Sequence, residues 1–185
     1  FSIMIPACRF GLAFALTAQD KGIEAEWEAR TAVAGFERLL GAEQTMTLYC
    51  RQSLAEMLEE LGQHAKAERE LRSVIAICER THRAEHPFAF QCHVKLADVL
   101  NEQGKLEEAE KEFRAMIAVS ERSHGAESLE TLSLKSSWAD ALTNQGKKGE
   151  AEQEYRAIIS ITSRVFGSES PGTLESRINL AGALR

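Results

Sequence analysis

The chain has 185 residues, of which 44% are hydrophobic and 27% are charged, and its formal net charge is −6. This length is sufficient to bury a substantial core, and the composition is typical of a water-soluble helical protein. The acidic balance, with no run of basic residues and no patch that mixes aromatic and basic residues, argues against a nucleic-acid partner.

The N-terminal run, residues 1–18, is mostly apolar, and Arg9 is the one charged residue in it. Leu12, Ala13 and Leu16 have the spacing of a helix that recurs later in the chain, which favours a first repeat helix. The alternative is a signal remnant, because residues 5–8 resemble a lipoprotein cleavage site, although the run has no initiator Met and no basic leader. The run is too short and broken to span a membrane. We expect something to cover such an apolar helix. The alternatives are a preceding segment, a second copy of the chain and a membrane.

A unit of 42 residues recurs along the chain. Gly62, Gly104 and Gly146 are each 42 residues apart, and residues 58–82 match residues 100–124 at 12 of 25 positions. The register extends back to Trp27 and forward to Leu184. We therefore expect one array over residues 1–185, with units at about 4–41, 46–83, 88–125 and 130–167 and a partial unit at 172–185.

Each unit is predicted to be a pair of helices. In the second unit the first helix is expected from Met46 to Leu61, because apolar residues recur there at steps of three and four. A glycine follows, which supplies the left-handed backbone needed after a helix C-terminus. The second helix is expected from Ala65 to His82. Near the C-terminus, Ser170 followed by a proline has the pattern of a helix start.

A single helical hairpin of this kind cannot bury its own apolar stripe, whereas stacked hairpins can, at about 1.5–3 kcal/mol per large side chain. The predicted fold is therefore all-α, a right-handed solenoid of about four repeats and a terminal helix. Such arrays present long surfaces to other proteins. The sequence has no phosphate-binding glycine loop, no nucleophile–base pattern and no paired catalytic carboxylates, so we expect neither an enzyme nor a cofactor.

The unit resembles the tetratricopeptide repeat in the long form of kinesin light chains. The resemblance rests on residues 99–110 (VLNEQGKLEEAE), on Phe113-Arg114 and on the loop around Glu85-His86-Pro87, and it covers about residues 20–185. Residues 164–167 and 179–181 are similar to the loop and first-helix signatures of that family. The short array looks most like the bacterial kinesin light chains that accompany bacterial tubulins. This resemblance implies an accessory protein of a tubulin-like filament.

In the tetratricopeptide fold, first helices line a concave groove. The residue before the recurring Leu-Ala pair is often Asn in kinesin light chains, where it contacts a cargo peptide, and only Asn179 matches here. Acidic residues follow the pair and form a stripe that also contains Lys95. This acidic stripe would select a basic or amide-rich segment of a partner. The alternative is that it is a solvated face. The candidate groove residues are Tyr49, Ser53, Glu56, Gln91, Lys95, Asp98, Ser137, Asp140 and Asn179.

Two ladders of arginine recur at the period of the repeat. In the first, a Glu precedes each Arg by four residues, which indicates stabilising pairs within a helix; these are Arg30, Arg72, Arg114 and Arg156, with Glu26, Glu68, Glu110 and Glu152. The second lies near the ends of the second helices, where cations suit the helix dipole and could also bind an acidic polymer. It consists of Arg38, Arg80, Arg122 and Arg164.

The remaining candidates favour structural roles. Cys50 and Cys92 are one period apart and are predicted to be buried free thiols in a reducing, cytoplasmic compartment, with a disulfide between them as the alternative. Cys78, His82 and His86 have a spacing that could hold a metal ion, but the trio is not repeated, so no metal site is expected. Trp138 replaces a recurring core Leu and is expected to be buried, whereas Trp27 falls on an outer position and is a candidate contact residue.

These observations predict a non-enzymatic scaffold that docks on another protein. The preferred partner is a bacterial tubulin filament, on the resemblance alone. The alternative is an adaptor that binds a short peptide of a signalling or cargo partner in its concave groove. The residues leave open which face binds, whether two copies pair and whether the chain is a fragment.

Overall fold

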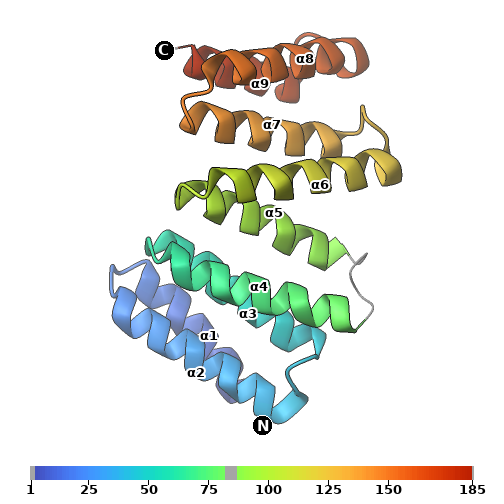
Figure 1. Ribbon diagram of the computed structural model, residues 1–185. Coiled ribbons are helices and arrows are strands. Elements are labelled where there is room, and N and C mark those ends of the chain that lie inside the picture. Colours follow the sequence, from blue (N-terminus) through green and yellow to red (C-terminus); the bar gives the residue numbers. More distant parts are fainter. Residues whose placement is uncertain (1–2, 82–86, 185) are drawn as a thin grey trace. The chain divides into compact units, whose positions relative to one another are not determined.

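The computed structural model describes residues 3–81 and 87–184, without the side chain of Pro87. In this part of the chain every regular element is an α-helix and no strand occurs (Figure 1). The helices are α1 (Met4–Thr17), α2 (Gly22–Leu40), α3 (Thr45–Glu60), α4 (His64–Arg80), α5 (Pro87–Glu102), α6 (Leu106–His124), α7 (Leu129–Asn144), α8 (Lys148–Phe166) and α9 (Pro171–Ala183). The all-α prediction is confirmed, and the second predicted unit matches α3 and α4 to within two residues at each end.

The chain divides into two compact units, Phe1–Val99 and Leu100–Arg185, with the division inside α5. Each unit is described by itself. The single array over residues 1–185 stays a prediction.

In the first unit, consecutive helices pack as neighbours: α1 against α2, α2 against α3, and α3 against α4. The N-terminal apolar run is thus a helix paired with α2, as its register predicts, and Ala13 and Leu16 are buried. The core continues through Phe36 of α2 and through Leu54 of α3, whose exposed fractions are 3% and 1%. Small alanines are fully buried between the helices, which allows close approach; they include Ala25, Ala29, Ala32 and Ala67.

In the second unit, α6 packs against α7, α7 against α8, and α9 against both α7 and α8. Trp138 is 7% exposed, and its ring centroid lies 5.6 Å from that of the fully buried Phe113. The prediction that Trp138 belongs to the core is confirmed. Leu142, Tyr155 and Ile158 complete this core.

The turns inside three of the hairpins depend on glycine, whereas Asp20 takes the left-handed position, with φ of 59°, in the turn between α1 and α2. Gly62, Gly104 and Gly146 have φ of 69°, 73° and 76°, in the left-handed region that other residues rarely adopt. The predicted role of these glycines is confirmed.

The loops between hairpins share a hydrogen bond that the sequence analysis missed. In three of them a threonine in the first turn of the next helix donates its hydroxyl proton to a glycine carbonyl six residues earlier, at 2.9 Å. The pairs are Thr47 with Gly41, Thr131 with Gly125, and Thr173 with Gly167. The predicted cap is also present, since the Ser170 hydroxyl accepts from the Thr173 amide and proline follows at the first helical position.

Candidate protein-binding surfaces

Six of the candidate groove residues lie on two first helices of the first unit, which we call the first-helix face: Tyr49, Ser53 and Glu56 on α3, and Gln91, Lys95 and Asp98 on α5. Within each helix they are three or four residues apart and therefore share one side. The two helices meet where Lys95 Nζ lies 3.9 Å from Glu56 Oε1. They also meet where the half-exposed Tyr49 ring packs edge-on against the ring of Phe88, with centroids 4.5 Å apart.

Glu56 is more constrained than a solvated surface carboxylate. Besides facing Lys95, its Oε1 accepts a hydrogen bond of 3.2 Å from Nε2 of Gln52. Gln52 is 9% exposed, and its buried Oε1 has no hydrogen-bond partner among the described residues. Buried polar atoms are usually satisfied, so this oxygen is an exception, and the amide of Gln52 is held by its hydrogen bond to Glu56. The sequence does not single out Gln52, because the equivalent position is not polar in every unit.

The remaining groove candidates lie in the second unit, with Ser137 and Asp140 on α7 and Asn179 on α9, and these two helices contact each other. Asp140 accepts a short hydrogen bond from the hydroxyl of Tyr155. Burial, together with this carboxylate, raises the pKa of Tyr155. The acidic stripe is therefore partly committed to internal contacts. The sequence signal was present, because Tyr155 occupies the register of Leu71, and a hydroxyl at a core position needs a partner.

The second arginine ladder is not uniform. Arg80 pairs with Glu43 at 2.7 Å and Arg164 pairs with Glu127, and in both cases the Glu lies just before the first helix of the same hairpin. Arg38 is exposed, and its Nε donates to the Ala34 carbonyl at 3.4 Å. Arg122 is also exposed. Exposed pairs of this kind contribute about 0–1 kcal/mol each, so this ladder remains accessible to an anionic partner.

The first arginine ladder is structural, as predicted. Each of its four arginines pairs with the Glu four residues earlier, at 2.7–2.9 Å. In α2 the pair extends into a network, because Glu26 also accepts from Lys66 of α4. Burial opposes ionisation of Glu26, but the hydrogen bonds from Lys66 and Arg30 outweigh it and lower the pKa of this carboxyl.

The cysteines are free thiols, and Cys50, Cys78 and Cys92 are buried whereas Cys8 is exposed. Burial, with smaller effects from Cys78 and Glu56, raises the pKa of Cys92 to about 12. The predicted burial of Cys50 and Cys92 is confirmed. No group of three metal-ligating side chains occurs in the described ranges; His82 and His86 lie outside them. Trp27 is 60% exposed, as predicted for a contact residue.

The helices are paired and repeat with one period, and polar side chains of the first helices are accessible. These features define an α-helical repeat protein of the kind that binds other proteins. None of the helices in residues 3–81 and 87–184 combines the length and apolar character required to cross a bilayer. A tetratricopeptide repeat family model matches residues 47–88, 94–130 and 131–172. The chain belongs to the tetratricopeptide repeat family. Members of this family are in general non-enzymatic scaffolds for protein–protein interaction.

Solved structures support the same conclusion. A kinesin light chain with TPR-like repeats from Podosopora anserina is 25% identical, with a TM-score of 0.80, over 96% of this chain and 84% of that one. BtubC (BKLC) from P. vanneervenii is 18% identical, with a TM-score of 0.75, over 93% of this chain and 68% of that one. Aspartyl phosphate phosphatase F from Bacillus subtilis is 14% identical, with a TM-score of 0.70, over 100% and 46%. No curated protein sequence gives a significant match. The resemblance to kinesin-light-chain-type repeats is thus confirmed.

Proposed function

We propose that this scaffold is an accessory protein of a filament built from a bacterial tubulin. The observation that supports it is the likeness to kinesin-light-chain-type structures along nearly the whole chain, BtubC among them. The net charge of −6 means that the chain would not be held to an acidic polymer by non-specific attraction. Binding would therefore depend on local surfaces, either the first-helix face or the exposed arginines of the second ladder.

A co-sedimentation assay with polymerised bacterial tubulin tests this proposal. We expect the protein to enter the pellet with the polymer at micromolar concentration, and to remain in the supernatant when the tubulin is unpolymerised. Lys95→Glu reverses a charge on the first-helix face, and Arg122→Glu reverses one on the second ladder. The variant that lowers pelleting identifies the surface used, and the other serves as its matched control.

Failure of the wild-type chain to pellet at micromolar concentrations would contradict a filament-binding role. Pelleting that is the same for polymer and for an unrelated filament of equal charge would contradict it as well, because the attraction would then be non-specific.

One observation favours the second candidate, an adaptor that binds an extended peptide. Gln52 Nε2 donates to Glu56, and Glu56 faces Lys95, so the first-helix face offers a carboxylate that a buried amide holds in place. An amide or ammonium donor of a peptide would pair with this carboxylate. This arrangement discriminates against acidic peptides.

Fluorescence anisotropy with a labelled lysine-rich peptide and with its glutamate-rich counterpart tests the adaptor. We expect only the basic peptide to bind, and Gln52→Leu, which removes the hydrogen bond that positions Glu56, to weaken binding by about fivefold to tenfold. Equal binding of both peptides, or no effect of this substitution in a protein of unchanged helicity, would count against the adaptor without affecting the filament assay.

A further inference from the structure

The exposed side of α3 has an apolar half and an acidic half. Met46 and Tyr49, in the N-terminal half of the helix, are 53% and 46% exposed. Glu56 and Glu60 lie in the C-terminal half, and 37% of the Glu56 side chain is exposed. Tyr49 and Glu56 are seven residues apart, so they lie on one side of the helix and about 10 Å apart along its axis. A ligand that contacts both needs an apolar group and a cation at that separation.

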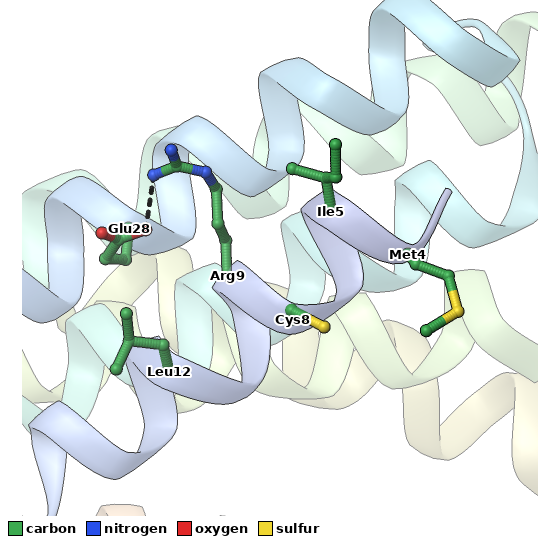
Figure 2. Close-up of a pocket in the computed structure, with 6 residues that line it drawn as sticks. All are labelled: Met4, Ile5, Cys8, Arg9, Leu12 and Glu28. Carbon is green, nitrogen blue, oxygen red and sulfur yellow. Dashed lines mark hydrogen bonds and ion pairs between the residues drawn. The ribbon is translucent and has the colours of Figure 1, made fainter. Parts of the chain in front are cut away.

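The first helices before and after α3 are both in contact with it. α1 contacts α3, and α5 meets it where Phe88 packs on Tyr49 and where Lys95 faces Glu56. Figure 2 shows a separate hollow, which is lined by residues of α1 and by Glu28 of α2. None of those residues belongs to the exposed side of α3. The exposure of Tyr49 therefore does not depend on what lies next to α1.

The aromatic ring of Tyr49 is particular to this helix. The equivalent positions of the other first helices hold Ala7, Gln91, Ser133 and Glu175, so the repeat does not require an aromatic residue here. The ring packs edge-on against that of Phe88, with centroids 4.5 Å apart, and this contact restricts its orientation. A ring that is already held loses little conformational freedom when a partner packs on it, and tyrosine is enriched at protein interfaces.

Glu56 provides the acceptor for a cation. Gln52 Nε2 donates to its Oε1 at 3.2 Å and holds the carboxylate in place. Lys95 Nζ is 3.9 Å from the same oxygen, which is longer than a hydrogen bond. A carboxylate has two oxygens that accept several hydrogen bonds, so Glu56 keeps acceptor capacity for a lysine or an arginine of a ligand. Lys95 is then a competing cation at the border of this contact.

We propose that the first-helix face binds an extended peptide segment in which a large apolar side chain lies three residues from a lysine or an arginine. In the polyproline II conformation, side chains three residues apart point to the same side and lie about 9 Å apart, which matches the separation of Tyr49 and Glu56. The apolar side chain packs on the Tyr49 ring, and the cation pairs with Glu56. This inference rests on the adaptor, the second candidate function, and adds to it the apolar contact and the spacing.

The test is fluorescence anisotropy with a short labelled peptide of proline, serine and glycine that carries one phenylalanine three residues before one arginine. A peptide with serine in place of the phenylalanine is expected to bind about fivefold to tenfold more weakly. A peptide of the same composition, in which the phenylalanine and the arginine are adjacent, is expected to lose as much, because the two side chains then point in different directions.

Three variants locate the contact. Tyr49→Gln introduces the residue that α5 has at this position; it should weaken binding of the phenylalanine peptide by about tenfold and change binding of the lysine-rich peptide by less than about twofold. Phe166→Gln is the matched control, because Phe166 is 45% exposed on α8, and it should change neither. Lys95→Gln removes the competing cation and should strengthen binding about threefold, a gain that damage to the fold does not produce. Circular dichroism checks the helicity of each variant.

Equal binding of the phenylalanine and serine peptides, or unchanged binding by Tyr49→Gln, would overturn this inference. The adaptor would still stand if the lysine-rich peptide bound and its glutamate-rich counterpart did not. If no basic peptide bound at concentrations up to about 1 mM, the adaptor and this inference would fail together. A dimer of the chain that Tyr49→Gln dissociates, seen by analytical ultracentrifugation, would also overturn the inference, because a second copy would then occupy the face.

Discussion

Tyr155 shows how a single hydroxyl group links a core to a candidate binding face. Its ring is buried between α7 and α8, and its hydroxyl donates to Asp140, whose side chain is accessible from outside. The hydrogen bond fixes the orientation of a carboxylate that the sequence analysis had assigned to partner binding. A substitution at Tyr155 would therefore alter stability and surface together.

We expect Tyr155→Phe to lower the free energy of unfolding by about 1 kcal/mol near neutral pH, because one hydrogen bond is lost while Asp140 can be rehydrated. The pKa of Tyr155 is raised in the folded state. Its contribution is thus fully present below the unfolded pKa of about 10 and is lost as the pH rises through the folded value. Urea unfolding between pH 8 and pH 11 should show a steeper loss of stability in the wild-type chain than in Tyr155→Phe.

Lysines also lose their protons in this alkaline range. The prediction therefore concerns the difference in pH dependence between the two proteins and not the pH dependence of either one alone. Parallel loss of stability with pH in both would show that Tyr155 is not the group responsible.

Residue roles that depend on contacts within one helix could be predicted from the sequence, whereas roles that depend on contacts between helices could not. The Glu–Arg pairs of the first ladder were predictable because four residues along a helix fix the distance between the side chains. The hydrogen bond from Tyr155 to Asp140 and the unpaired oxygen of Gln52 were not, because each depends on how two helices pack. Spacing along a single sequence does not determine such contacts.

At the scale of the element, the helical hairpins are governed by their turns. Gly146 has φ of 76° between α7 and α8, whereas Gly149 lies in the first turn of α8 with nothing near the position of a Cβ atom. The same substitution at the two sites therefore has opposite physical consequences.

Gly146→Ala should lower the free energy of unfolding by about 1–2 kcal/mol, because alanine is strained in the left-handed region. Gly149→Ala should raise it by about 0.5 kcal/mol, through higher helix propensity. Chemical denaturation of both variants measures the difference, and each is the control for the other. A neutral Gly146→Ala would show that this turn does not limit stability, and a destabilising Gly149→Ala would show that helix propensity does not govern the second site.

The helices themselves were predictable from apolar spacing and from the glycines that follow them. The hydrogen bonds from threonine to glycine between hairpins were not found, although Gly and Thr six residues apart recur three times, at residues 41 and 47, 125 and 131, and 167 and 173. Apolar spacing along the helices does not predict this bond, because it joins a loop to the next helix.

At the scale of the whole molecule, the repeat made the fold of each compact unit predictable because consecutive helices within a unit pack on one another. The period continues without interruption across the division at Val99, so no sequence signal marks the two compact units. The binding surface was less predictable, because a repeat array offers several equivalent faces and the partner determines which one is used.

In both compact units an ion pair joins a first helix to the second helix that precedes it. Glu37 of α2 pairs with Arg51 of α3, and Glu121 of α6 pairs with Lys135 of α7 at 2.7 Å. The two members of each pair are less than one period apart, so a gene duplication of one repeat that begins before the acid and ends after the cation copies them together. Unequal recombination at such breakpoints would add a hairpin that already carries this ion pair.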